Sequence, residues 1–587
     1  MMDSITRTRL IFILIVVGAL CIVGVSLVYQ FVAPGDGDGS GFTAASVANT
    51  PPPAGAIVVE IESSNTKEDW MDHVIASFNA GGHTVNGKQI VVTVAHIGSG
   101  SSMNDILDGT VQPVVWSPGS DLWVTSINQA WQDRTGRRLI NGECPATLRL
   151  PLTIAMWRPM AEALGWPDAA IGWDDIAALS TNPEGWAAYG HPEWGQFKFG
   201  HPHPEHSNSG MLSLVAEVYS AAGLTEGLTV DIVKSQAVIE DVGAVEQQVF
   251  HYGKKDTDIL LRMTQRGPDY LHAVTSYEAN VIKWNQDHRD ELRFPLVAIY
   301  PDDGTFWVEN PYCILDAADW VTDEQKEAAV MFRDYLLSPE QQKLAIDWGL
   351  RPVDASVALR APIDMAHGAV PAITIARVPH LAYPSDEIVG HILDVWHQAK
   401  KKATVLLLID TSGSMQGTKI KGAVDGAVTF VDQMDPADEV YVVIFSSKVT
   451  ELPIAGPVGQ VREELKSSLR SLYAGGATAL HEAVIYGVDR IEQFKAQDEA
   501  MDERRLYGIV LLSDGMNDIY GGPSENDMFS HLPSGMEASG VKIYTIAYGN
   551  DADIDVLATL ANRTNGKQFT GDVEDIEAVY FLISSEF

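Results

Sequence analysis

The sequence predicts an α/β protein: an N-terminal transmembrane helix followed by two α/β domains, the second of them a doubly wound sheet. Three observations lead to this fold class. A long apolar run lies near the N-terminus, strand and helix patterns alternate from residue 56 to 375, and a second alternation begins at residue 404. The 587 residues also exceed the size of one ordinary domain, which is about 100–200 residues.

The apolar run extends from Leu10 to Val32 and follows Arg7 and Arg9. About 20 apolar residues span a membrane, whereas the apolar part of a secretory signal has about 7–15. Bulky residues at positions 29–31 stand where a small-x-small cleavage motif would be expected. We therefore expect residues 1–33 to be a cytoplasmic stub and an uncleaved signal anchor, with the rest of the chain outside the cell. A long cleaved signal peptide is the alternative.

Composition narrows the classes of function. Lys and Arg number 40 against 78 Asp and Glu, a formal charge of -38, which argues against a nucleic-acid partner because phosphate binding needs a basic surface. The negative charge suits a soluble domain outside the cell. Residues 34–55 are rich in Gly, Ser, Ala and Pro without periodicity and predict a flexible linker.

The chain has three cysteines, and Cys21 lies inside the apolar run. Cys144 and Cys313 remain, far apart in the sequence. They form one disulfide in an oxidising compartment, or they are two unrelated buried thiols. Spacing alone does not separate these alternatives, but a location outside the cell favours the disulfide.

Residues 56–375 are predicted to form the first α/β domain. The expected strands are Ile57–Ile61, Ile90–Ala95 and Val111–Trp116. Apolar residues recur at helical spacing between 70 and 78, and residues 324–337 have an amphipathic helical pattern. Strands separated by helices predict a parallel or mixed sheet with helices on both faces. Prolines then interrupt any regular pattern, so residues 376–403 are predicted to be a linker and a connecting helix.

Residues 404–587 are predicted to form the second domain. The segment Thr404–Ile409 is a nearly continuous apolar run, which is typical of a buried parallel strand. Apolar residues between 420 and 431 follow at helical spacing. Further strands are expected at Val440–Phe445, Leu506–Leu512 and Val541–Tyr548, and further helices at Val461–Leu472, Leu480–Phe494, Ile554–Ala561 and Val573–Ile583. This alternation predicts a doubly wound, Rossmann-like sheet.

Oxygen-bearing side chains follow the strands of this domain. Asp410, Ser412 and Ser414 follow the first strand, Thr478 follows a Gly-Gly pair, and Asp514 follows a later strand. In open α/β sheets, ligands bind beyond the carboxyl ends of the strands. Carboxylate and hydroxyl oxygens suit a hard cation, Mg²⁺ first, with Mn²⁺ and Ca²⁺ as alternatives. The competing interpretation is that these are turn and helix-capping residues.

The pattern Asp-x-Ser-x-Ser, a later Thr and an Asp after a strand resembles the metal-ion-dependent adhesion site of von Willebrand factor A domains, over roughly Thr404 to Phe587. By this resemblance, Asp410, Ser412 and Ser414 contact the ion directly or through water. Thr478 and Asp514 complete the shell. With only two charged ligands the ion stays electropositive, so it can accept a carboxylate from a protein partner.

Ser- and Gly-rich stretches punctuate the first domain, at Ser63–Lys67, Gly98–Ser102, Trp116–Ser120 and Pro204–Gly210, with Gln341–Gln342 and Gly349–Pro352 near its end. The pattern resembles bacterial extracellular solute-binding proteins of the two-lobed periplasmic-binding type, over about Ile57 to Arg360. Such loops expose N–H and hydroxyl donors that bind anions. The candidate ligand contacts are Ser64, Ser99, Ser101, Ser120, Ser209 and Tyr277. For any single serine, a turn or cap role is the competing interpretation.

Four histidines, at 191, 201, 203 and 206, gather in a Trp- and Pro-rich stretch. One interpretation is a metal site, because histidine is a common ligand. Their spacing matches no familiar ligand pattern, so we predict a surface loop instead.

No P-loop, H-E-x-x-H or G-x-S-x-G motif is present, so we expect a binding protein and not an enzyme. The expected partners are a protein that offers an acidic residue to the metal, a small solute or anion, and the membrane. The alternative is a surface solute receptor for transport or sensing in which the second domain only docks.

Overall fold

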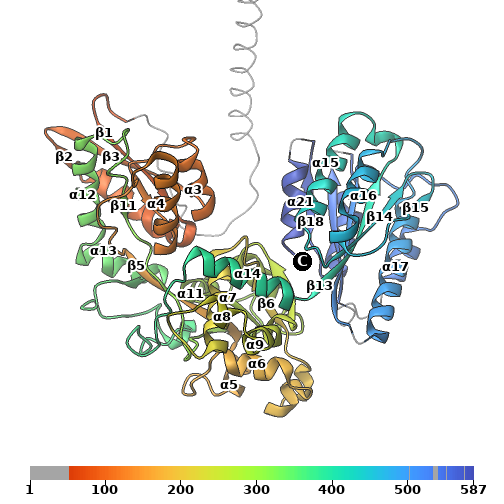
Figure 1. Ribbon diagram of the computed structural model, residues 1–587, viewed down its shortest axis with the longest axis horizontal. Helices are drawn as coiled ribbons and strands as arrows, with labels where there is room; N and C mark the ends of the chain where they lie inside the picture. The colour runs from red at the N-terminus through yellow and green to blue at the C-terminus, as the bar shows by residue number, and fades with distance from the viewer. Residues whose placement is uncertain (1–51, 502, 533–539, 550, 574) are drawn as a thin grey trace, which may run out of the picture. The chain divides into compact units, whose positions relative to one another are not determined.

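The computed structural model describes residues 52–501, 503–532, 540–549, 551–573 and 575–587 (Figure 1). The predicted anchor at residues 1–33 and most of the predicted linker at 34–55 lie outside these residues. Within the described part of the chain, no helix combines the length and the apolar character that crossing a membrane requires.

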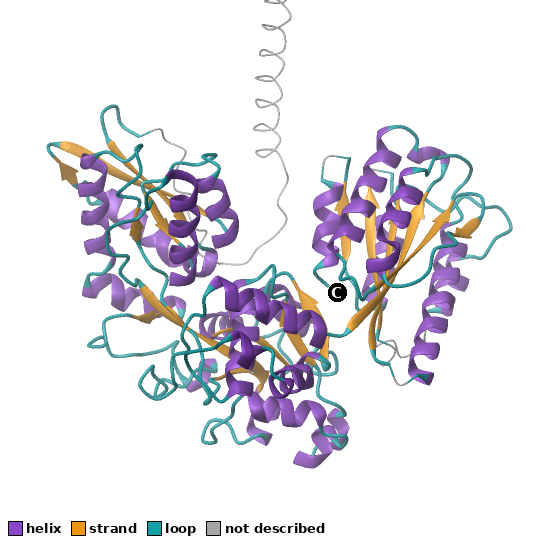
Figure 2. Cartoon of the chain, in the orientation of Figure 1, coloured by secondary structure: helices purple, strands orange, loops and turns teal. Residues whose placement is uncertain are grey.

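The first domain contains two sheets with helices packed on them (Figure 2). In the first sheet the order is β11-β4-β1-β3-β2, and the central β1 is parallel to both β3 and β4. Its strands are β1 (Ile57–Ser63), β2 (Thr84–Val85), β3 (Lys88–His96), β4 (Val115–Ser117) and β11 (Cys313–Ile314). The neighbouring helices along the chain are η1 (Asn65–Lys67), α2 (Glu68–Ala80), α3 (Ser99–Leu107), α4 (Asp121–Thr135), α12 (Asp323–Leu336) and α13 (Pro339–Ala345).

The second sheet has the order β10-β5-β8-β6-β7, and β9 and β12 also pair with β5. Its strands are β5 (Leu148–Trp157), β6 (Phe199–Pro202), β7 (Val249–Gly253), β8 (Ala273–Tyr277), β9 (Leu296–Ile299), β10 (Trp307–Val308) and β12 (Arg351–Pro352). Its helices are α5 (Arg158–Ala163), α6 (Trp173–Thr181), α7 (Asn208–Ala222), α8 (Val230–Val233), α9 (Gln236–Glu246), α10 (Asp256–Arg266) and α11 (Glu278–Asp287), with short turns η2 (Gly185–Tyr189), η3 (Pro192–Trp194), η4 (Ile346–Trp348) and η5 (Met365–His367).

The chain crosses between these sheets three times: between α4 and β5, between β10 and β11, and between α13 and β12. The first two crossover segments are linked to each other. They run side by side: the Thr147 amide donates to the carbonyl of Glu309, and the Tyr312 amide donates to that of Pro145, at 3.1 and 2.9 Å. A disulfide joins Cys144 of the first crossover to Cys313 at the end of the second. Each of these two segments is therefore held against the other by hydrogen bonds and by a covalent bond.

The predicted strand Val111–Trp116 begins late, because β4 starts only at Val115. Pro113 has no amide hydrogen to donate to a neighbouring strand, so the segment before it does not join the sheet. The predicted connecting helix is α14 (Asp386–Ala399). Its apolar residues, including Ile392 and Trp396, belong to the hydrophobic core of the first domain, so α14 is packed there.

The second domain is one six-stranded sheet of order β15-β14-β13-β16-β17-β18, parallel except for the edge strand β15. Its strands are β13 (Lys402–Asp410), β14 (Glu439–Phe445), β15 (Val449–Glu451), β16 (Arg505–Ser513), β17 (Val541–Tyr548) and β18 (Gln568–Gly571). Counted from the first strand, this order is 3-2-1-4-5-6, the arrangement of doubly wound nucleotide-binding folds. The predicted fold class is confirmed for this domain.

Helices cover both faces of this sheet, each over its own hydrophobic core (Figure 1). The helices are η6 (Gly413–Met415), α15 (Thr418–Gln433), α16 (Val458–Arg470), α17 (Leu480–Ala500), α18 (Glu525–His531), α20 (Ile554–Arg563) and α21 (Ile576–Ser584). Alternate residues of β13 serve opposite faces: Val405 and Leu407 pack toward α15, α16 and α21, and Leu406 and Leu408 pack toward α17. The continuous apolar run of β13 is explained by this burial on both sides.

Candidate metal centre and solute site

The predicted metal ligands gather at the carboxyl end of the central strands of the second sheet. Strand β13 lies parallel to β16 with Ile409 opposite Leu512, so Asp410 and Ser513 end the two strands side by side. This is the point where the strand order reverses, between the first and fourth strands, which is where doubly wound sheets bind ligands. Asp514 follows β16 directly, at the same edge.

A continuous set of hydrogen bonds connects four of the five predicted ligands. Asp410 Oδ1 accepts from the Ser412 amide at 2.8 Å, and Ser412 Oγ lies 2.9 Å from Ser414 Oγ. Ser414 Oγ in turn donates to Asp514 Oδ1 at 2.6 Å. The other oxygen of Asp410 accepts from Ser513 Oγ at 2.7 Å. Two carboxylates and three hydroxyls therefore converge on one place.

Thr478 is brought to the same place by its loop. The Gly413 amide donates to the carbonyl of Gly476 at 2.9 Å, and the Gly475 amide donates to that of Thr411 at 2.8 Å. A methyl group built on Gly515 would lie 3.8 Å from Ser414 Oγ and 3.9 Å from Thr478 Oγ1, so both hydroxyls lie beside Gly515.

The two carboxylates of the site are buried, while Ser414 is exposed. Asp410 and Asp514 are both fully buried, and burial raises the pKa of Asp410, with Asp514 adding to the rise. Lys419 Nζ lies 2.6 Å from Asp514 Oδ2. Two buried carboxylates beside one lysine leave negative charge in excess, and buried charges are normally paired or bound to metals. Oxygen donors of this kind fit a hard divalent cation.

Sequence reasoning missed three residues around this centre. Ser513 and Lys419 each contact one of the two aspartates, and Asp518 accepts a hydrogen bond from the Thr478 amide. Ser513 could have been noticed as the neighbour of Asp514. No sequence pattern predicts that Lys419, on the first turn of α15, reaches a carboxylate that lies 95 residues away in the chain.

The predicted solute contacts fall into connected groups. Ser99 Oγ accepts from the Gly119 amide at 2.9 Å, and the Tyr277 hydroxyl accepts from Asn208 Nδ2 at 2.9 Å. A methyl group on Gly119 would lie 3.5 Å from Ser99 Oγ and 3.8 Å from Asn208 Nδ2, so these partners are adjacent. Trp123 Nε1 also donates to Asn208 Oδ1, at 3.2 Å. Asn208 therefore connects helix α4 to Tyr277, and the sequence did not indicate it.

The other serines differ in their surroundings. Ser120 is buried next to Gly119 at the start of α4, and Ser209 is buried in the first turn of α7, where its hydroxyl contacts that of Ser207. Ser101 is exposed on α3, so the structure does not bring it into this buried group.

Ser64 lies beside a lysine that sequence reasoning did not consider. Lys67 is 1% exposed, and its Nζ donates to Ser64 Oγ, the Ser117 carbonyl and Asn310 Oδ1 at 3.1, 3.0 and 3.2 Å. Burial lowers the pKa of Lys67 to about 7. All three donors of an ammonium group are thus used to hold the loops after β1 and β4 together. Lysines are seldom fully buried, so sequence alone would not select it.

The predicted surface loop at the histidine cluster is wrong for His201 and His203, which are 0% and 6% exposed. His201 belongs to strand β6, which lies between β8 and β7 in the second sheet, and His203 packs against Trp396. The prolines at 202 and 204 suggested a loop, but Pro202 is the last residue of the strand, a position that its missing amide hydrogen tolerates.

Comparison with known families agrees with both folds. Residues 404–583 match the model of the von Willebrand factor type A domain, and residues 59–351 match that of the bacterial extracellular solute-binding protein. Solved structures that are similar include the sulfate-binding protein SubI from Mycobacterium tuberculosis, with a TM-score of 0.35 and 21% identity over 55% of this chain and 96% of that one. A von Willebrand factor type A protein from Catenulispora acidiphila has a TM-score of 0.27 and 17% identity over 32% and 42%.

Among curated relatives, inter-alpha-trypsin inhibitor heavy chain H4 of Bos taurus is 33% identical over 113 residues, 19% of this chain and 12% of that protein. Heavy chain H3 of Mus musculus is 24% identical over 28% of this chain and 18% of that protein, so the match spans less than a fifth of either relative. An uncharacterized protein of Mycobacterium tuberculosis is 24% identical over 422 residues, 69% of this chain and 58% of that protein. Within the chain, a segment similar to bacterial extracellular solute-binding proteins, residues 59–351, therefore precedes a segment similar to the von Willebrand factor type A domain, residues 404–583.

Proposed function

We propose that this chain is a membrane-anchored extracellular binding protein that docks onto a protein partner through a divalent cation, Mg²⁺ in the first place. The observation that carries the proposal is the hydrogen-bonded set of Asp410, Ser412, Ser414 and Asp514 at the switch point of the type A sheet. Thr478 completes the ligand set.

The residues of the site would hold the cation, and the cation would supply a coordination position for a carboxylate of the partner. Asp410 and Asp514 contribute the only carboxylates among the five proposed ligands, so the ion keeps positive charge toward solvent. Lys419 would give up its contact with Asp514 when the ion arrives, because both cations compete for the same buried carboxylate.

Exposed apolar side chains support a protein as the partner. Tyr473 and Tyr520 are 85% and 104% exposed, and Met516 is 65% exposed. They lie on the loop before Thr478 and on the loop after Asp514, close in sequence to the proposed ligands. Tyrosine and methionine are enriched at protein interfaces. A single exposed apolar residue is ordinary, but three of them near one site support an interaction surface.

The solute-binding domain would take a small solute or anion between its two sheets, close to the loops that Ser64, Ser99, Ser120 and Tyr277 occupy. Hydroxyl and amide donors at these loops support this assignment. The alternative is a surface receptor for transport or sensing, in which the type A domain serves only for docking. The docking function and the receptor function are both binding functions, and we propose no enzymatic activity for either domain.

Calorimetric titration of Mg²⁺ into the full-length chain tests the metal proposal. Asp410→Ala should abolish binding, since it removes a buried charged ligand, and Asp555→Ala should leave it unchanged because Asp555 is exposed on α20. Equal binding by the native chain and the Asp410 variant would refute the site. A solute that raises the midpoint of thermal unfolding equally with and without chelator would favour the receptor alternative.

A further inference from the structure

A second cluster of metal-ligating side chains lies inside the solute-binding domain. His201 on β6, Glu217 on α7 and Glu246 at the end of α9 meet in the interior, with exposed fractions of 0%, 3% and 0%. One nitrogen and one oxygen from each carboxylate lie within 4.8 Å of one another. Two carboxylates are rarely buried together without a compensating charge.

The spacing of the atoms matches coordination to one ion. His201 Nε2 lies 3.2 Å from Glu217 Oε1 and 3.8 Å from Glu246 Oε1. Ligand bonds of about 2.0–2.2 Å at a tetrahedral angle place ligand atoms about 3.4 Å apart. The observed separations fall on either side of that value.

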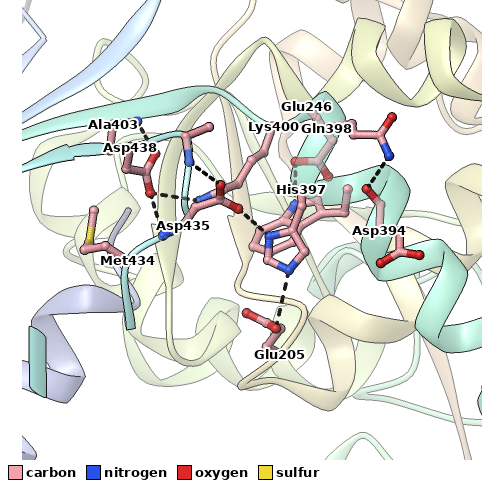
Figure 3. A network of polar contacts seen from close by, with 12 residues as sticks. Glu205, Glu246, Asp394, His397, Gln398, Lys400, Ala403, Met434, Asp435 and Asp438 are labelled. Carbon is pink, nitrogen blue, oxygen red and sulfur yellow. Dashed lines mark hydrogen bonds and ion pairs between the residues drawn. The ribbon is translucent and has the colours of Figure 1, made fainter. Parts of the chain in front are cut away.

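Neighbouring groups orient His201 and Glu246. His201 Nδ1 lies 2.7 Å from the Pro202 carbonyl, to which it can only donate, so Nε2 is free to act as a ligand in the neutral ring. Glu246 Oε2, on the side chain labelled in Figure 3, accepts from the Tyr252 hydroxyl and from Trp396 Nε1, the latter at 3.1 Å. Hydrogen bonds of this kind fix metal ligands in known sites.

These contacts leave one oxygen of each carboxylate without a donor. Across the part of the chain that the structure describes, Glu217 Oε2 and Glu246 Oε1 have no hydrogen-bond partner, although both are buried. An unpaired buried carboxylate oxygen costs free energy, and a bound cation would offset that cost.

We propose that His201, Glu217 and Glu246 bind one divalent transition-metal ion of the Zn²⁺ class. An imidazole with two carboxylates suits Zn²⁺, and two negative charges balance its two positive charges in an interior that solvent does not reach. The ion joins β6 to α7 and α9, and Trp396 extends the link to α14. Its role is to hold these elements together, in contrast to the oxygen-only site of the type A domain.

The alternative to a metal ion is that bound protons neutralise the charge of this cluster. Burial lowers the pKa of His201, but Glu246 and Glu217 outweigh it and raise the pKa to about 9. Burial, together with Glu246, raises the pKa of Glu217 to about 7. An imidazolium, one carboxylate and one carboxylic acid would also be neutral, so the experiment must separate metal from protons.

The test is the zinc content of the full-length chain, refolded with Zn²⁺ and dialysed, measured by plasma mass spectrometry. We expect about one zinc per chain, kept in Asp410→Ala and in Glu240→Gln, an exposed residue of the same helix α9. Glu217→Gln and Glu246→Gln should lose it. Tyr252→Phe, which removes only an orienting hydrogen bond, should weaken zinc affinity about 10–100-fold.

A second measurement uses Co²⁺ in place of Zn²⁺ as a spectroscopic probe. It is made on the native chain and needs no variant. The native chain refolded with Co²⁺ should show the visible absorption of a low-coordinate site with nitrogen and oxygen ligands. Native protein that retains no zinc and shows no such band would overturn the proposal, and so would zinc retained by both glutamine variants. In either case protons balance the cluster. A chain that keeps zinc but fails the Mg²⁺ titration would refute only the docking site.

Discussion

Lys419 is the residue whose role depends most on the electrostatics of the type A site. Its Nζ is 2.6 Å from Asp514 Oδ2, and its side chain is 26% exposed while Asp514 is fully buried. It therefore compensates part of the charge that the cation would otherwise neutralise. A cation that binds Asp514 would compete with this contact, because both are attracted to the same carboxylate.

Lys419→Met should bind Mg²⁺ more tightly than the native chain. A hydrogen bond between charged groups contributes about 1.5–3 kcal/mol, so its removal should tighten Mg²⁺ binding by about tenfold or more. The measurement is the dissociation constant from calorimetry. Lys421→Met is the matched control, because Lys421 is exposed two residues away. A variant that binds more weakly than native protein would show that Lys419 assists the ion and does not compete with it.

At the scale of single residues, the sequence grouped Asp410, Ser412 and Ser414, which the structure brings together, and it did not group His201 with Glu217 and Glu246. Asp410, Ser412 and Ser414 lie within five residues of one another, so their grouping is visible as a motif. Glu217 and Glu246 are 16 and 45 residues from His201 and resemble ordinary helical glutamates. Only the packing of α7 and α9 on the second sheet shows that they are buried together.

Helix α14 is the element whose packing was least visible in the sequence. Its apolar face lies in the core of the solute-binding domain, while His397 on the same helix contacts acidic residues (Figure 3). His397 Nδ1 is 2.6 Å from Asp435 Oδ2, and Nε2 is 3.6 Å from Glu205 Oε1. The hydrogen bond to Asp435, together with Glu205, raises the pKa of His397 to about 9.

This histidine makes stability depend on pH. Because its pKa is higher in the folded than in the unfolded chain, its contribution is complete below about pH 6.5 and is lost as pH rises through about 9. Two further charged residues lie near His397: Asp394, and Lys400, which pairs with Asp438. The acidic neighbours have the larger effect, so the pKa of His397 is raised.

We expect His397→Asn to lower the midpoint of thermal unfolding at about pH 6 and to leave it nearly unchanged at about pH 10. Scanning calorimetry across this range measures the difference from the native chain. Gln398→Ala, an exposed and non-titrating neighbour, should show no such trend. A difference of equal size at both ends of the range would mean that His397 acts by packing alone.

At the level of elements, burial on both faces made β13 easy to predict, and amphipathic spacing did the same for residues 324–337, which form most of α12. The strands β15 and β18 were not predicted. Each has three or four residues at a sheet edge, so too few side chains are buried to leave a pattern. Their pairing comes from the strand beside them.

For the whole molecule, the disulfide between Cys144 and Cys313 closes a covalent loop with a sequence separation of 169 residues. It connects the crossover segment before β5 to the one that ends at β11. A cross-link of this span stabilises mainly by limiting the freedom of the unfolded chain.

The double variant Cys144→Ser/Cys313→Ser should lose about 2–5 kcal/mol of unfolding free energy. Urea denaturation followed by fluorescence measures this loss. Reduction of the native chain should reproduce it and should have no effect on the double variant. Equal stability of reduced and oxidised native chain would contradict the prediction.

The sequence by itself determined the α/β class, the doubly wound type A sheet and its Asp-x-Ser-x-Ser motif, because periodicity and local motifs are properties of neighbouring residues. Only the tertiary structure decided which distant groups meet. Lys419 reaches Asp514, Lys67 fastens the loops beside Ser64, and His201 joins Glu217 and Glu246 through such contacts. The physical reason is that burial and pairing of charges depend on which helices and strands pack together, and single-sequence spacing does not encode that packing.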